Sequence, residues 1–155
     1  INIPILGAVP MVDIDIDDED SLSEKLDTED VNFSNDKINI AVIKLPHISN
    51  FTDFNPLSRR KEIALKYISD TSEIIGADLI IIPGTKNTIF DLRWLKRRGF
   101  TKYVLVDKNI CGICGGFQML GNHLYDPFTV EEGGREPGLG LLSFETVFLQ
   151  IYKAS

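Results

Sequence analysis

Three short apolar runs, each followed closely by glycine or proline, constrain the fold more than any other feature of this 155-residue sequence. They are Ile38–Ile43, ended by Pro46; Leu79–Ile82, ended by Pro83 and Gly84; and Ile110–Ile113, ended by Gly115 and Gly116. Continuous apolar runs that end in turn residues are typical of parallel strands buried on both faces. The alternation of Ile63, Leu65 and Tyr67 suggests a further strand, although a helix is an alternative there.

The segments between the runs carry helix signals. Thr88 is a candidate N-cap, basic residues 96–98 charge the last turn, and Gly99 supplies the stop. The apolar side of this helix would comprise Ile89, Leu92 and Leu95. A second, short helix is expected to begin at Phe117. Strands that alternate with helices predict an α/β layer fold around a mostly parallel sheet.

Negative charge is concentrated near the start of the chain. The whole sequence has 16 Lys+Arg and 23 Asp+Glu, which gives a formal net charge of −7. Ten acids and one base lie between Asp13 and Asp30, so this stretch carries −9 and the remainder about +2. We expect residues 1–36 to hold the end of a preceding domain and an acidic linker, and residues 37–155 to form the folded domain. A first residue other than Met suggests part of a longer protein.

Charge and composition also exclude several classes of function. The remainder of the chain implies no broad basic face, so a nucleic-acid partner is not supported. The apolar runs are far shorter than the ~20 residues of a membrane-spanning helix, and no basic stretch precedes Ile1 as in a signal peptide. Two cysteines within one four-residue window form no disulfide framework and indicate a reducing, cytoplasmic setting.

The sequence offers no convincing metal or phosphate site. Residues 13–17 resemble the start of a calcium loop, but Asp18 stands where the sharp turn needs glycine and Asp20 where an apolar residue is expected. We interpret that run as a solvated linker. His47 and His123 look isolated, and no glycine-rich loop is followed by Lys-Ser or Lys-Thr.

The segment Gly112-Ile113-Cys114-Gly115-Gly116 carries the strongest chemical signal. It follows an apolar strand and precedes a helical pattern, as in the sulfur version of a nucleophile elbow. The turn would lift Cys114 out at the carboxyl end of the sheet, where a helix N-terminus favours the reactive thiolate. The N–H of Gly115 would point to a developing oxyanion, and a second N–H would come from Gly84 or Thr85.

Two other interpretations of Cys114 are open. It could be a small buried residue that packs among glycines. With Cys111 it also forms a C-x-x-C pair, which in an α/β context suggests thiol–disulfide exchange. Such a pair usually opens a helix with its first cysteine exposed, whereas Cys111 is expected inside the apolar run.

With these residues in view, the chain resembles the cobyric acid synthase family, in its class I glutamine amidotransferase domain. The resemblance rests on four blocks in family order: Asp13–Ser21, Leu45–Phe54, Pro83–Ile89 with Asp91 and Leu92, and Gly112–Gly121. Cobyrinic acid a,c-diamide synthases are similar, and the Ile48–Asp53 stretch favours the cobyric acid family. The resemblance implies a three-layer, open, mostly parallel sheet of the flavodoxin-like type.

The resemblance implies a glutaminase half-reaction in which the Cys114 thiolate attacks the side-chain amide of glutamine. Ammonia leaves, and water hydrolyses the glutamyl thioester. Gly115 with Gly84 or Thr85 would supply oxyanion amides, and Gln118 would contact substrate. Ammonia would then amidate corrin carboxylates that a companion domain activates with ATP and Mg, so no cofactor is expected in this chain.

Members of the family also carry a catalytic His, paired with an acid, well downstream of the Cys. This sequence has no His after His123, which lies nine residues beyond Cys114 in a loop-like stretch, and His47 belongs to another block. The connection between Gly99 and Ile110 is also short for the family. Without a general base thiol attack should be slow. We therefore expect an incomplete domain with weak or no activity alone; a non-catalytic amidotransferase-like binding module or a redox domain are the alternatives.

Overall fold

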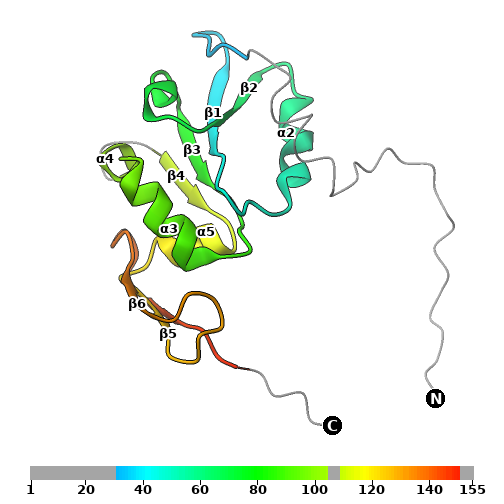
Figure 1. Cartoon of the computed structure of the whole chain (residues 1–155). Helices are drawn as coiled ribbons and strands as arrows, with labels where there is room; N and C mark the ends of the chain where they lie inside the picture. Colours follow the sequence, from blue (N-terminus) through cyan, green and yellow to red (C-terminus); the bar gives the residue numbers. More distant parts are fainter. Residues whose placement is uncertain (1–30, 105–108, 151–155) are drawn as a thin grey trace, which may run out of the picture.

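The computed structural model describes residues 31–104 and 109–150 and contains a four-stranded parallel sheet (Figure 1). Its strands are β1 (Ile38–Ile43), β2 (Ile63–Ile68), β3 (Leu79–Ile82) and β4 (Asn109–Gly112), in the order β2-β1-β3-β4. The predicted parallel sheet is confirmed, and the helical alternative for the β2 segment is wrong. The last strand ends one residue earlier than predicted, although Ile113 N–H still donates to Ile82 O at 3.0 Å.

Helices cover both faces of this sheet. Alternate residues of each strand point to opposite faces, so Ala41 and Ile43 pack with helix α3 (Thr88–Arg97) and helix α5 (Gly115–Met119). Ile40 and Val42 pack on the other face with Phe54, from the 3₁₀ turn η1 (Phe51–Phe54) that leads into α2 (Asn55–Ser58). The three layers predicted from the sequence are therefore present.

Helix α3 follows its apolar pattern closely. Ile89, Leu92 and Leu95 are all fully buried against the sheet, and Gly99 adopts the left-handed conformation, with φ of +81°. The prediction of Thr88 as N-cap is wrong by one residue. The cap is Asn87, whose side chain accepts the N–H of Phe90 at 3.1 Å, and Thr88 is the first helical residue.

Three further segments complete the connections of the central sheet. The 3₁₀ turn η2 (Thr71–Ile74) follows β2, and the four-residue helix α4 (Thr101–Val104) lies in the short connection before β4. Helix α5 begins at Gly115, two residues before the predicted start at Phe117, because the chain turns into the helix directly after Cys114.

A second, small sheet was not predicted. It consists of β5 (His123–Asp126), β6 (Gly134–Pro137) and β7 (Glu145–Val147), in the order β6-β5-β7. β6 is antiparallel and β7 parallel to β5. His123 therefore begins a strand, which contradicts its interpretation as part of a loop. Arg93 and Lys96 of α3 each lie 2.8 Å from Glu136 of β6 and so join this sheet to the helical layer.

The predicted acidic linker and the first of the four family blocks lie outside the described residues. The described part begins just before β1, where Phe33 packs against the core and Ser34 N–H donates to Asn39 Oδ1 at 3.0 Å. Among residues 31–104 and 109–150, no helix has the length and apolar character needed to cross a membrane.

Candidate active site

Cys114 occupies a strained turn between β4 and α5. Its φ of 50° and ψ of −114° are rare for a residue with a side chain, and the side chain is exposed. The turn depends on its glycines: a Cβ on Gly116 would lie 2.0 Å from Ile82 O, and one on Gly112 2.7 Å from Gly116 O. The geometry is that of a nucleophile elbow, and the interpretation of Cys114 as a buried packing residue is wrong.

The loop after β3 lies against this elbow, as predicted. A Cβ placed on the buried Gly84 would be 3.6 Å from Cys114 Cβ and 3.0 Å from Ser49 Oγ. A Cβ placed on Gly115 would be 3.4 Å from the backbone nitrogen of Thr85. The structure thus brings together Cys114, Gly115, Gly84 and Thr85, which the sequence analysis had selected from two separate motifs.

The backbone amides around the elbow include unpaired donors. The loop after β1 forms an antiparallel bridge between Ile48 and Thr85, in which Ser49 N–H donates to Gly84 O and Lys86 N–H to His47 O, both at 2.9 Å. The bridge uses the carbonyl of Gly84 and the N–H of Lys86, which flank Thr85, and it does not use the N–H of Thr85 itself. Within the described ranges, neither Thr85 N–H nor Gly115 N–H donates a hydrogen bond. Both are available to an oxyanion.

A buried carboxylate fixes the two loops behind these amides. Asp91, in the first turn of α3, is fully buried and accepts three hydrogen bonds. The donors are Thr85 Oγ1 at 2.5 Å, the backbone N–H of His47 at 3.1 Å and His47 Nδ1 at 2.8 Å. Asp91 therefore ties the loop after β1 to the loop after β3, and it holds the residue whose N–H faces the elbow.

The sequence analysis did not assign a role to Asp91, although a signal was present. Asp91 lies four residues before Leu95 and two after Ile89, on the side of α3 that packs inward. A charged residue on the buried side of an amphipathic helix needs partners, because an unpaired buried charge is very costly. The expectation that His47 is isolated is also wrong, because its backbone N–H and its imidazole are two of the three partners of Asp91.

His47 has the geometry of an oriented imidazole. Nδ1–H donates to Asp91, which leaves Nε2 as the acceptor, and the ring packs edge-on against Phe90 with centroids 4.9 Å apart. The side chain is 41% exposed. Within the described ranges no hydrogen bond joins His47 to Cys114, so the pair Asp91–His47 borders the elbow without engaging its thiol.

Gln118 lies on α5, one turn beyond Cys114, and is half-buried. The hydroxyl of the buried Thr88 donates to Gln118 Oε1 at 3.4 Å, and a Cβ on Gly115 would be 3.1 Å from that hydroxyl oxygen. Gln118 therefore links α5 to α3 directly beside the elbow. Its predicted contact with substrate stays a prediction.

The second cysteine and the other histidine do not behave as expected. Cys111 is exposed, because β4 is an edge strand among the described residues, so the argument that burial disfavours a Cys111–Cys114 redox pair is wrong. Both thiols are free.

His123 lies between Glu145 Oε1, 3.3 Å from Nδ1, and the Arg135 guanidinium, 2.6 Å from Nε2. In the described part of the chain, no group of three His, Cys, Asp or Glu side chains could hold a metal ion.

Comparison with known proteins accounts for this elbow. The family model of the CobB/CobQ-like glutamine amidotransferase domain matches residues 39–154, which is most of the chain. The chain belongs to this family. The match runs from the second residue of β1 through β7 and includes all three family blocks that lie in the described part, so the resemblance inferred from the sequence is confirmed.

Three relatives of this CobB/CobQ-like domain are cobyric acid synthases. The cobyric acid synthases of Ruminiclostridium cellulolyticum and Lachnoclostridium phytofermentans are each 49% identical to it, over 152 and 151 residues. That of Alkaliphilus metalliredigens is 49% identical over 153 residues. These matches cover 95–96% of this chain but only 29–30% of each relative. The chain thus spans about 30% of the length of the curated relatives it matches.

Proposed function

We propose that this chain is the glutamine-hydrolysing, ammonia-supplying part of a cobyric acid synthase. The observation that carries the proposal is the exposed Cys114 in a strained elbow, with Thr85 packed against Gly115 and with neither residue's N–H donating a hydrogen bond in the described part. A nucleophile with two preorganised amide donors is the arrangement that acyl transfer requires. The matched glutamine amidotransferase family supports the choice of glutamine amidotransfer among acyl-transfer reactions, and the relatives' name supports cobyric acid synthase.

In the proposed reaction the Cys114 thiolate attacks the side-chain carbonyl carbon of glutamine. A C–S bond forms, and the carbonyl electron pair moves to oxygen, where the N–H groups of Gly115 and Thr85 or Gly84 stabilise the charge. The amide nitrogen takes a proton, the C=O bond re-forms and the C–N bond breaks, so ammonia leaves a glutamyl thioester. Water hydrolyses the thioester to glutamate and restores the thiol. Gln118, beside the elbow on α5, would contact the bound glutamine.

Proton transfer to the leaving nitrogen needs an acid–base group. The resemblance assigns this role to a His downstream of the Cys, and this sequence has no His after His123. We therefore expect the chain alone to hydrolyse glutamine weakly or not at all, because the attack would lack its base. Formation of one covalent bond at Cys114 does not need a full catalytic cycle, which makes it the better test.

The rest of the proposed reaction belongs to a longer protein. Ammonia would pass to a corrin side-chain carboxylate that a companion domain activates with ATP and Mg, in the cytoplasm. The relatives, about three times as long as this chain, are consistent with such a companion. ATP and Mg are assigned to that companion, as the resemblance implies.

The test is covalent labelling with a diazoketone analogue of glutamine, read by intact and peptide mass. We expect one adduct, confined to Cys114 and suppressed by excess glutamine, in the wild type and in Cys111→Ser. Cys114→Ser should give none. Iodoacetamide, which needs only a reactive thiol, serves as the control for access to both cysteines.

Other results would overturn the proposal. Absence of an adduct, with a mass two hydrogens light across Cys111 and Cys114, would assign the pair to thiol–disulfide exchange. Absence of an adduct with both thiols free would mean that this chain has no working glutamine site. If glutamine still bound in that case, measured by calorimetry, the chain would be a non-catalytic binding module.

A further inference from the structure

A basic cavity lies at the end of the sheet opposite Cys114. It has a volume of about 250 Å³ and is lined at its rim by Lys37, Arg59, Arg60 and Lys61. Lys37 directly precedes β1, and residues 59–61 precede β2 with only Glu62 between, so the cavity sits at the amino ends of these parallel strands. The elbow follows the carboxyl end of β4. The cavity is therefore separate from the candidate active site.

The four cations of this basic cavity lack carboxylate partners within residues 31–104 and 109–150. Some cations elsewhere in the described part have carboxylate partners: Lys66 with Glu73, Arg93 and Lys96 with Glu136, and Arg98 with Asp70. Asp36, the neighbour of Lys37 in sequence, accepts a hydrogen bond from Ser34 and also attracts Lys37 through its charge. The exposed Glu62 follows Lys61. The cavity still presents a net positive charge, because its four cations outnumber these two carboxylates.

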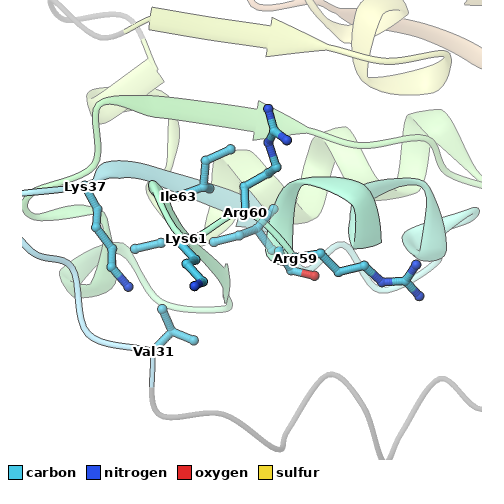
Figure 2. A pocket seen from close by; sticks show the side chains of 9 residues that line it. Val31, Lys37, Arg59, Arg60, Lys61 and Ile63 are labelled. Atoms are coloured by element: carbon cyan, nitrogen blue, oxygen red, sulfur yellow. The ribbon is translucent and has the colours of Figure 1, made fainter.

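The chain enters the described part at this cavity. Val31 lines it, and Figure 2 shows the ammonium groups of Lys37 and Lys61 on the side of Val31. The guanidinium groups of Arg59 and Arg60 point in two other directions. The floor contains apolar side chains of the start of β2, such as Ile63. A volume below the ~300 Å³ of small-molecule pockets suits a few side chains better than a cofactor.

We propose that the occupant of this cavity is the acidic segment Asp13–Asp30 of the same chain. That segment carries −9 and ends one residue before Val31. At ~3.5 Å per extended residue, Asp27, Glu29 and Asp30 lie within about 15 Å of Val31 in any conformation. A tether this short gives an effective concentration in the millimolar range, so modest attraction to the cations is enough for docking.

Carbodiimide coupling, which joins a carboxylate directly to a lysine amine, tests this contact in the whole chain. Lys37 and Lys61 report on the cavity, and Lys102, exposed on α4, is the matched control amine. Peptide mass should show coupling of Lys61 to acids of residues 13–30 at about fivefold the yield at Lys102. Raising NaCl from about 0.05 M to about 1 M shortens the screening length to about 3 Å and should remove most of that excess.

A variant separates charge attraction from mere tethering. Arg59→Gln with Arg60→Gln leaves both reporter amines in place but halves the positive charge of the cavity. We expect at least a roughly twofold loss of coupling at Lys61 at low salt, where screening is weakest. Arg97→Gln, which removes an exposed cation on α3, should leave the yield unchanged.

Several outcomes would overturn the proposal. Coupling at Lys61 that ignores both salt and the Arg59→Gln/Arg60→Gln change would reflect tethering alone. Coupling between isotopically distinct chains in a mixture would assign the cavity to a second copy. Protection of Lys61 by inorganic phosphate, well beyond that by chloride of equal ionic strength, would assign it to a free anion.

Discussion

Asp91 is the residue on which the two loops of the candidate active site depend. Its buried carboxylate accepts hydrogen bonds from the Thr85 hydroxyl and from two donors of His47. The same loop offers the Thr85 N–H to the elbow. A carboxylate with three donors has no equivalent among neutral side chains of similar size, because an amide places an N–H₂ group where one oxygen accepted.

The first prediction concerns Asp91→Asn. This change turns one acceptor into a donor that faces the donors of Thr85 and His47, so we expect the free energy of unfolding to fall by about 2–4 kcal/mol. Urea unfolding followed by circular dichroism measures it. Glu62→Gln, at an exposed carboxylate in the loop before β2, should change the value by less than about 0.5 kcal/mol.

Thr85 provides the matched pair for that prediction. Thr85→Ser keeps the hydroxyl that donates to Asp91 and should stay close to wild type, whereas Thr85→Val removes the donor and should cost about 1–3 kcal/mol. Equal stabilities of the two variants would show that the hydrogen bond from Thr85 to Asp91 does not hold the loop.

At the scale of the element, helix α3 is capped by the residue next to the predicted one and by a distant loop. Asn87 Oδ1 accepts the N–H of Phe90, and Glu131 Oε2 accepts the N–H of Ile89 at 2.9 Å. Asn87 Nδ2 also donates to Glu132 at 3.1 Å. The loop between β5 and β6 therefore completes the first turn of α3, the turn that carries Asp91.

The second prediction concerns this cap. Asn87→Ala removes the side-chain acceptor for Phe90 N–H, and Glu131→Ala leaves Ile89 N–H without its acceptor. Each change should lower the free energy of unfolding by about 1 kcal/mol in urea titrations. Asn122→Ala, at an exposed side chain before β5, is the control and should be nearly neutral. A loss at Asn87 no larger than at Asn122 would contradict the assigned cap.

The strands differ in how well the sequence predicts them. β1 and β3 were predicted because both faces of these strands are buried, which leaves continuous apolar runs. The strands of the second sheet are short, and β6 (Gly134–Pro137) and β7 (Glu145–Val147) are largely exposed, so no apolar pattern marks them. The N-cap was misplaced because Asn87 and Thr88 both suit the position, and Glu131 reaches α3 only through the fold.

The same distinction holds for the site. Cys114, Gly115, Gly84 and Thr85 could be chosen in advance because parallel strands align their carboxyl ends, which brings the two loops together. The hydrogen bonds between Asp91 and His47 could not be predicted, because they depend on the path of the loop after β1 rather than on any local sequence pattern.

At the scale of the whole molecule, two carboxylates of the small sheet make its main polar contacts. Asp126 binds the loop between β5 and β6, and Glu136 binds α3. Burial alone would raise the pKa of Asp126, but the N–H groups of Val130, Glu131 and Gly133, at 2.7–2.8 Å, outweigh it and hold that pKa below its usual value. Burial would also raise the pKa of Glu136, but the hydrogen bonds and charges of Lys96 and Arg93 outweigh it and hold that pKa below its usual value. Both carboxylates therefore stabilise the fold only while ionised.

The third prediction follows from the sign of these shifts. A carboxylate whose pKa is lower in the folded than in the unfolded state contributes stability above its unfolded pKa, near 4, and loses it as pH falls through the folded pKa. We expect the free energy of unfolding to be nearly constant from about pH 7 to about pH 5 and to fall as the pH drops further, through the folded-state pKa values of the two carboxylates. Urea titrations across this range measure it.

Asp126→Asn separates this effect from general acid expansion of the chain. The amide cannot be protonated in this range, so the variant should be less stable at neutral pH yet lose less stability on acidification. Because the Asp126 loop also carries Glu131, which caps α3, the two losses should be coupled in a double variant with Glu131→Ala. A pH dependence of the unfolding free energy identical to that of the wild type would contradict the prediction. Acid sensitivity would then arise from other groups, and Asp126 would contribute to stability without setting its pH dependence.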